Sequence, residues 1–204
     1  MAVWQRPPGA SPVPLPAPRV RLRPFCAADL DRLARWREEP EARAYQPLRR
    51  LTRAELRAEL EEASSGPIGD RTRSRFQWIV ERLEDQAAIG WVTLTVKSRE
   101  HGIAEIGYTL SAPYHRRGYG TEAVQLLVAR AFAEPDLYRL EAVCAVENEA
   151  SWRLLERVGF RREGRLREYY VIEGRRVDHY LYACLKPEWA PPRGRGAGPG
   201  LAAA

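Results

Sequence analysis

Cysteine is scarce in this 204-residue chain, and no apolar run approaches the length needed to span a membrane. Its three cysteines, Cys26, Cys144 and Cys184, are widely spaced and form no Cys-x-x-Cys pair. An odd, dispersed set excludes a zinc ribbon and argues against a disulfide framework, so we expect no metal site. The N-terminus also lacks the basic and then apolar order of a secretory signal. We therefore expect a soluble, cytoplasmic protein with no membrane partner.

Lysine is nearly missing as well. Lys97 and Lys186 are the only two lysines, so almost every positive charge is an arginine, and we attribute this bias to genome composition before phosphate recognition. The formal net charge is +6, and removing the arginines of the terminal segments (Arg6, Arg193 and Arg195) leaves about +3. This weak surplus suits a small polyanionic ligand or an acidic partner, and it does not predict direct nucleic-acid binding.

Both ends of the chain are rich in Pro, Gly and Ala and show no regular apolar pattern. Such segments cannot bury enough side chain to offset the entropy lost on ordering. We predict a single domain at residues 19–189, with disordered extensions at 1–18 and 190–204.

The first half of the domain changes from helical to strand periodicity. Residues 20–25 alternate as a strand, and residues 27–38 have helical spacing. A second helix is predicted at 52–63, where Thr52 and Glu55 form a capping box. Three strands with short connections follow, at residues 75–82, 88–96 and 103–110, so an antiparallel meander is the simplest topology.

The second half predicts a helix, a strand, a helix and two strands. The helices cover residues 121–134 and 149–160, the strand between them covers 138–146, and Gly159 stands where a helix usually stops. The last two strands flank a Glu173-Gly174 turn. The fold class is therefore α/β, a mixed sheet with helices on both faces.

A glycine-containing turn links the strand at 103–110 to the next helix. Gly118 and Gly120 precede the free N–H groups of a helix start, which favour an anion, and Arg116 and Arg117 add positive charge. A short glycine motif alone also fits an ordinary tight turn. The Gly-Lys-Ser/Thr of a P-loop is absent, and a strand from a meander does not suit a dinucleotide fold.

The stretches "IGYTLSAPYHRRGYGTEA" and "VENEASWRLLERVGF" resemble the GNAT superfamily of N-acetyltransferases, and within it the RimJ/RimL-like branch of ribosomal-protein alanine N-acetyltransferases. The resemblance spans about residues 19–189. The second signature of the family, Asn-x-x-Ser before a helix that ends in Gly-Phe, falls on Asn148, Ser151, Gly159 and Phe160, and its late aspartate falls on Asp178. The acetyl-CoA motif, Gln/Arg-x-x-Gly-x-Gly/Ala, falls on His115, Arg116, Arg117, Gly118, Tyr119 and Gly120, with His115 as a departure from the usual first residue.

This resemblance implies the GNAT fold, a mostly antiparallel sheet whose middle strands splay apart and admit the pantetheine of acetyl-CoA. The amides from Arg116 to Thr121 would bind its pyrophosphate, and the backbone N–H near Leu110 would bind the thioester oxygen. Asn148 and Ser151 would contact the pantetheine. The implied reaction is direct acetyl transfer to a primary amine in a ternary complex, with coenzyme A as product.

Two catalytic side chains are proposed. Ser151 could protonate the leaving thiolate, or equally cap its own helix. Glu105 is the best candidate base because it lies opposite the apolar side of its strand, with Glu141 as an alternative; for both, an ion pair is the competing interpretation. An α-amine with a pKa of about 7.7 to 8.0 needs less help than a lysine at about 10.4, so a protein N-terminus or a small amine is the expected acceptor.

Other functions remain open from the residues alone. A non-catalytic acyl-CoA-binding module would keep the fold and bind the cofactor without turnover. An acetyltransferase for an aminoglycoside or small metabolite would differ in segments that carry no readable code. An arginine-rich nucleic-acid binder is disfavoured by the glutamates in every helix. We expect a monomer or a homodimer.

Overall fold

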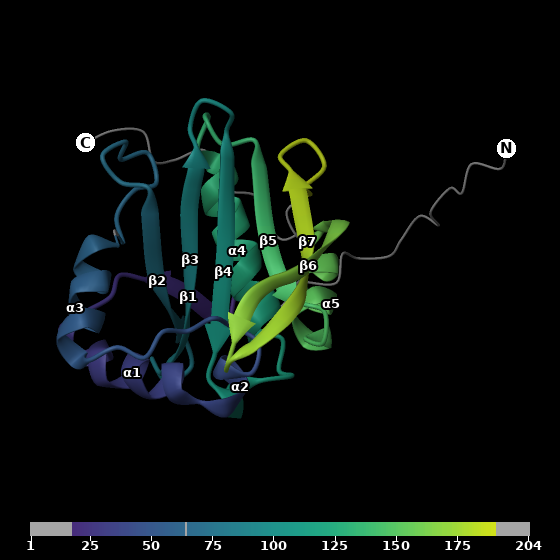
Figure 1. Cartoon of the computed structure of the whole chain (residues 1–204). Coiled ribbons are helices and arrows are strands. Elements are labelled where there is room, and N and C mark those ends of the chain that lie inside the picture. Colours follow the sequence, from purple (N-terminus) through teal and green to yellow (C-terminus); the bar gives the residue numbers. More distant parts are fainter. Residues whose placement is uncertain (1–17, 64, 191–204) are drawn as a thin grey trace, which may run out of the picture.

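The computed structural model describes residues 18–63 and 65–190, which form one seven-stranded sheet with helices on both sides (Figure 1). The strands are β1 (Val20–Arg23), β2 (Arg75–Arg82), β3 (Ala88–Ser98), β4 (Ile103–Leu110), β5 (Arg139–Ala145), β6 (Arg161–Ile172) and β7 (Arg175–Leu185). The helices are α1 (Leu30–Glu38), α2 (Pro40–Arg43), α3 (Arg53–Glu62), α4 (Tyr119–Ala133) and α5 (Glu149–Val158), with 3-10 turns η1 (Ala27–Asp29) and η2 (Ala112–Tyr114).

The strand order is β1-β2-β3-β4-β5-β7-β6. Strands β1 to β4 pair antiparallel in sequence order, which confirms the predicted meander. The pairs β5–β7 and β6–β7 are antiparallel as well, whereas β4 and β5 are parallel. The mixed, mostly antiparallel α/β sheet was therefore predicted correctly.

Alternation along the strands divides the core into two layers. Trp78 of β2 is paired with Val92 of β3, and both lie in the large cluster beneath α4 and α5. The next pair, Ile79 with Trp91, points the other way and packs against α1 and α3. We call the side covered by α4 and α5 the rear face and the opposite side the front face (Figure 1).

The parallel strands β4 and β5 separate after a short contact. Only Ile103–Glu105 pairs with Arg139–Glu141, although β4 continues to Leu110. Over its whole length β5 pairs instead with β7. The two ribbons diverge in Figure 1, so a gap opens between them towards η2 and the start of α4. This gap confirms the expected splay of the middle strands.

Most element boundaries agree with the periodicity. The helix α3 has the predicted capping box of Thr52 and Glu55, and α5 stops at Gly159, whose φ is +107°. The strand β6 begins before the predicted residue 167, because its exposed edge carries little apolar alternation. The four residues of α2 are too few for a periodic pattern to reveal.

Two expectations concern the ends of the chain and membranes. Apart from residues 18 and 190, the predicted extensions at 1–18 and 190–204 lie outside the described residues. Within residues 18–63 and 65–190, no helix is long and apolar enough to cross a membrane.

Candidate active site

The turn before α4 has the backbone conformation of an anion cradle. Gly118 is the N-cap of α4 with a φ of +82°, and its helix start has no side-chain cap. Arg116 also has a positive φ, +57°. Since the first amides of a helix have no acceptor within it, the N–H groups of Tyr119, Gly120 and Thr121 are available for a bound anion. The exposed Arg116 and Arg117 supply positive charge nearby. We call residues 115–121 the cofactor turn, after the cofactor expected here from the sequence.

Arg19 supports this turn, although no sequence motif indicates that it does. Its guanidinium donates to the Arg117 carbonyl at 3.0 Å, forms an ion pair with Glu122 at 3.1 Å and lies 4.9 Å from the Tyr119 ring centroid. A Cβ on Gly118 would come within 3.0 Å of the same guanidinium. Because Arg19 is 98 residues from Arg117, only the fold brings this cation to the turn.

Gly120 allows α4 to approach the sheet closely. A Cβ at this position would lie 3.0 Å from a methyl group of Leu154 and 3.1 Å from one of Leu110. The missing side chain therefore brings the start of α4 against both β4 and α5. The two glycines serve different needs, since Gly118 adopts a left-handed conformation and Gly120 gives room for packing.

The N–H of Leu110 points into the gap between β4 and β5. Ser111 donates its N–H to the Ile89 carbonyl at 2.9 Å, so the pair Gly90–Leu110 is a non-hydrogen-bonded pair of the antiparallel ladder. In such a pair both backbone groups of Leu110 face away from β3. Its carbonyl accepts a 2.8 Å bond from Nε2 of His115, and its N–H faces the same side. His115 thus helps to hold this end of β4.

Ser151 lies on the rear side of the gap, in contact with Tyr108. The two hydroxyl groups are 2.8 Å apart, and burial raises the pKa of Tyr108 well above its usual value. Asn148 caps α5 by accepting the Ser151 N–H at 3.1 Å, so the capping role considered for Ser151 belongs to Asn148. Burial also raises the pKa of the Cys144 thiol to about 11, partly offset by a hydrogen bond with Ser151.

Both glutamates proposed from the sequence are engaged in ion pairs. Glu105 lies 3.1 Å from the ammonium of Lys97. Glu141 bonds Arg139 at 2.7 Å. Glu105 and Glu141 are directly opposite each other in the parallel pair, at the end where the strands have not yet separated. At about 3.3 Å per residue, Glu105 is about 16 Å from Leu110 along the strand.

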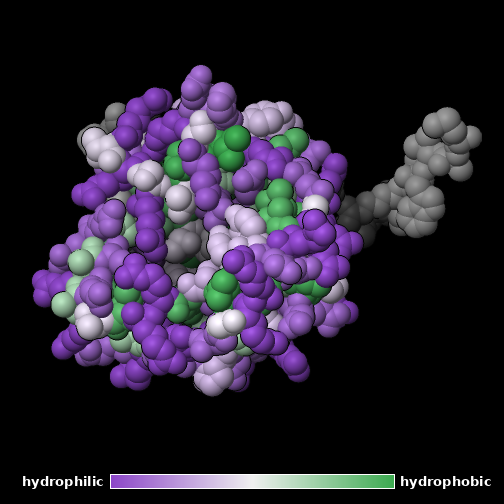
Figure 2. All heavy atoms as spheres, in the orientation of Figure 1, coloured by the Kyte–Doolittle hydropathy of each residue, from purple (hydrophilic) through white to green (hydrophobic). Residues whose placement is uncertain are grey.

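The front face beside Leu110 is covered by the segment around α2. Gln46 bonds the hydroxyl of Thr109 at 2.9 Å. Figure 2 shows this face hollowed near its centre, over β3 and β4. Gly107 of β4 has no side chain, and a Cβ added there would meet only Thr93 within 4 Å. The β6–β7 turn closes one side, because Arg43 of α2 forms an ion pair with Glu173. The hollow is therefore bounded by residues from distant segments.

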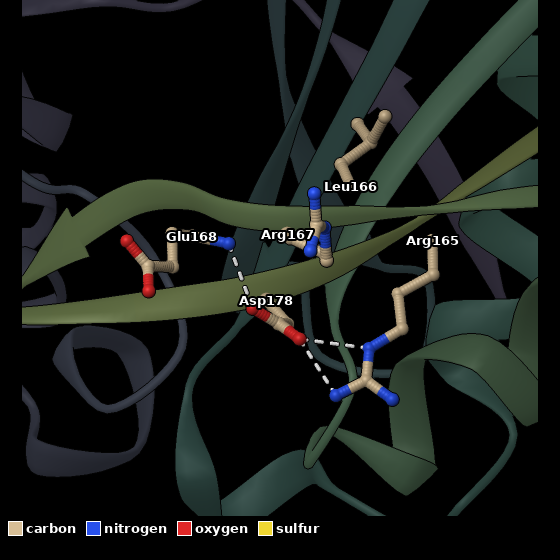
Figure 3. Close-up of a pocket in the computed structure, with 5 residues that line it drawn as sticks. All are labelled: Arg165, Leu166, Arg167, Glu168 and Asp178. Carbon is tan, nitrogen blue, oxygen red and sulfur yellow. Dashed lines mark hydrogen bonds and ion pairs between the residues drawn. The ribbon is translucent and has the colours of Figure 1, made fainter.

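Asp178, the late aspartate of the family pattern, has a structural role. It accepts the N–H of Glu168 at 2.7 Å and pairs with Arg165 at 2.6 Å, as Figure 3 shows. Glu168 has a φ of +49° and lies in a bulge between Leu166 and Tyr170. These five residues Arg165, Leu166, Arg167, Glu168 and Asp178 line an open pocket of about 730 Å³. We assign Asp178 to holding the bulge of β6.

Taken together, the gap, the inward N–H of Leu110 and the bare helix start define a class of protein. They suit an acyl thioester carried on a nucleotide. Its acyl oxygen would accept a hydrogen bond from a backbone N–H, and its pyrophosphate would bind at a helix N-terminus. The family model described as "Acetyltransferase (GNAT) domain" matches residues 19–161. The chain belongs to the GNAT acetyltransferases, and it is an N-acetyltransferase that uses acetyl-CoA.

Named relatives agree with this family. An uncharacterized N-acetyltransferase p20 of Bacillus licheniformis is 31% identical over 172 residues, which cover 84% of this chain and 96% of the relative. The ribosomal protein uS5-alanine N-acetyltransferase of Escherichia coli is 31% identical over 43% of this chain and 45% of its own length. The fold is similar to that of spermidine N-acetyltransferase from Vibrio cholerae, solved with CoA and spermine, with a TM-score of 0.73, 21% identity and coverage of 83% and 97%.

Proposed function

We propose that the protein acetylates a protein N-terminal α-amine or a small primary amine by direct transfer in a ternary complex. The single observation that supports this proposal most directly is the direction of the Leu110 N–H, which faces away from β3 towards the gap between β4 and β5. An amine entering from the front face would meet a carbonyl polarised by this N–H.

The cofactor turn supplies binding rather than chemistry. The amides of Tyr119, Gly120 and Thr121 would hold the pyrophosphate, and Arg116 and Arg117 would approach it from the solvent side. Arg19, which directly precedes β1, adds positive charge and donates a hydrogen bond to the Arg117 carbonyl. Asn148 holds the start of α5 in place beside the pantetheine.

Ser151 is the proposed proton donor for the departing thiolate. Its hydroxyl bonds the Tyr108 hydroxyl at 2.8 Å, and the raised pKa of Tyr108 keeps that phenol protonated at neutral pH. A thiol has a pKa of about 8.5, so a hydroxyl in this position gives sufficient help.

The base available in the site limits the pKa that the acceptor amine can have. An α-amine with a pKa of about 7.7 to 8.0 is partly neutral at pH 7.5, whereas lysine at about 10.4 would need on the order of 4 kcal/mol. Carboxylates at the front face suit the first kind of amine. Glu105 stays the prediction from sequence for this base; with Lys97 beside it and Leu110 five residues away, it would act through water.

A thiol-release assay tests the proposal. Acetyl-CoA would be offered with N-terminal peptides, polyamines, amino acids and aminoglycosides, and an acetylated product would be identified by mass. We expect turnover with the N-terminal peptides, whose α-amines are partly neutral at pH 7.5, and a cytoplasmic acceptor. Tight acetyl-CoA binding without turnover on any amine would point instead to a non-catalytic binding module.

A further inference from the structure

Glu39 reaches the end of β4 from a segment that no motif covers. The helix α1 stops at Glu38 because Pro40 disfavours a helical conformation in the residue before it. Glu39 accordingly has an extended backbone, with φ −59° and ψ +132°, and is the N-cap of α2. This break turns its carboxylate towards the sheet.

Glu39 accepts hydrogen bonds from Ser111 and Ala112, the two residues that follow Leu110. Its Oε1 accepts the Ser111 hydroxyl at 2.7 Å, and its Oε2 accepts the Ala112 N–H at 3.0 Å. Ser111 is only 5% exposed, whereas Glu39 is partly exposed. A carboxylate has about four acceptor positions, so two remain free after these bonds.

Glu39 and Glu105 lie at different distances from Leu110, the last residue of β4. Glu39 contacts the residues that directly follow Leu110, whereas Glu105 is five residues before Leu110 and bound to Lys97. The neighbouring front-face hydroxyl, Thr109, is bonded to the neutral Gln46. Among the described residues around this end of β4, Glu39 is thus the carboxylate in direct contact with it.

We propose that Glu39, with the Ser111 hydroxyl as relay, is the base that deprotonates the acceptor amine. The proposal rests on the proposed function. One proton of the ammonium passes to Oγ of Ser111 as the Ser111 proton passes to Glu39. The neutral amine then forms the N–C bond, the C–S bond breaks, and the second amine proton is delivered to the thiolate through Ser151. The products are the amide, the free thiol and one proton, which Glu39 releases to water.

A purely structural role for Glu39 predicts different data. If it only anchors α2 to η2, its loss would shift the front face and weaken acceptor binding, with a higher KM and an unchanged pH profile. A base instead affects the turnover step and loses importance once the amine is neutral. The pH dependence therefore separates the two roles.

The test compares Glu39→Gln with Glu105→Gln and with Glu41→Gln, which removes an equal charge two residues away on α2. We expect Glu39→Gln to lower kcat roughly 10²-fold at pH 7 with unchanged acetyl-CoA affinity, and the deficit to shrink above the pKa of the amine. Glu41→Gln should behave like the wild type. Ser111→Ala keeps the carboxylate but removes the relay, and it should lower kcat at least about 10-fold with the same relief at high pH.

Three results would overturn the proposal. The first is a higher acceptor KM in Glu39→Gln with normal kcat at every pH. The second is wild-type turnover and pH profile in Ser111→Ala, which also decides the matter if Glu39→Gln does not fold. The third is a pH-relieved loss in Glu105→Gln that Glu39→Gln lacks.

Failure of this inference differs from failure of the proposed function. Normal turnover in Glu39→Gln removes the role of Glu39 and leaves the acetyltransferase site as described. A wild-type protein that binds acetyl-CoA and releases no thiol with any amine would remove both.

Discussion

The cofactor side and the front face of the site are built in opposite ways. The cofactor turn is one continuous stretch of seven residues, and its donors are mostly backbone groups. The front face is assembled from pairs that lie 63, 72 and 130 positions apart, which are Gln46 with Thr109, Glu39 with Ser111, and Arg43 with Glu173. The proposed cofactor side is therefore largely local in the sequence, although Arg19 supports it from 98 positions away, whereas the front face depends on tertiary contacts.

The largest expected effect concerns the cofactor turn. Gly118→Asp places a carboxylate where an anion should bind, at a φ of +82° that disfavours most side chains. We expect acetyl-CoA affinity to fall by about 10³-fold, because a like charge costs several kcal/mol. Gly118→Asn is the matched control, since Asn tolerates this conformation without the charge. Calorimetric titration measures both, and equal affinities would mean that the pyrophosphate does not bind at this turn.

This contrast also explains what the sequence could and could not predict. The sheet, its meander and the turn follow from periodicity and from two glycines, Gly118 and Gly120, that are close in the chain. Arg19 and Glu39 were missed because each acts on a segment at least 72 positions away, and neither belongs to a local pattern. Glu105 was chosen because alternation puts it on the face opposite the apolar core, and periodicity alone does not give its distance from Leu110.

The front layer should be the more sensitive to acid. Asp29 of η1 is 1% exposed and ties this layer to the sheet through Arg23 of β1. Burial alone would raise the pKa of Asp29, but hydrogen bonds from Arg23 and Cys26 outweigh it and hold the pKa below its usual value. Since the unfolded pKa is higher, this carboxylate stabilises the fold above about pH 4 and ceases to do so as pH falls through the folded pKa.

Asp29→Asn should therefore cost about 2 kcal/mol at pH 7, because it removes one of the two buried carboxylates that pair with Arg23 and leaves Glu81 as the other. Urea unfolding of the wild type and the variant measures the difference, which should shrink as pH falls below about 4. If the difference in unfolding free energy between the wild type and Asp29→Asn stays constant down to the lowest accessible pH, Asp29 contributes through its shape and not its charge.

Ser151→Ala probes the side of the gap that faces the cofactor. We expect kcat to fall roughly 10- to 100-fold with acetyl-CoA affinity retained, because the thiolate loses its proton donor. Tyr108→Phe removes only the hydrogen-bonded partner of Ser151 and should cost less. If Tyr108→Phe is the more damaging of the two in steady-state assays, the phenol and not the serine is the proton donor.

The smallest expected effect lies at the mouth of the front face, where Arg43 joins Glu173. Arg43 is 14% exposed and Glu173 is 52% exposed, so the pair is partly screened by water and worth up to about 1 kcal/mol. Glu173→Gln should raise the acceptor KM about 2- to 5-fold and leave acetyl-CoA affinity unchanged, because the β6–β7 turn would no longer be held against α2. Exchanging the charges, with Arg43→Glu and Glu173→Arg combined, should restore much of the loss that either change causes alone. Steady-state kinetics with a peptide and with a small amine test this prediction. A larger rise in KM for the peptide would show that the β6–β7 turn contacts the residues following the amine. An equal loss of acetyl-CoA affinity would mean that the two sides of the site are not built independently.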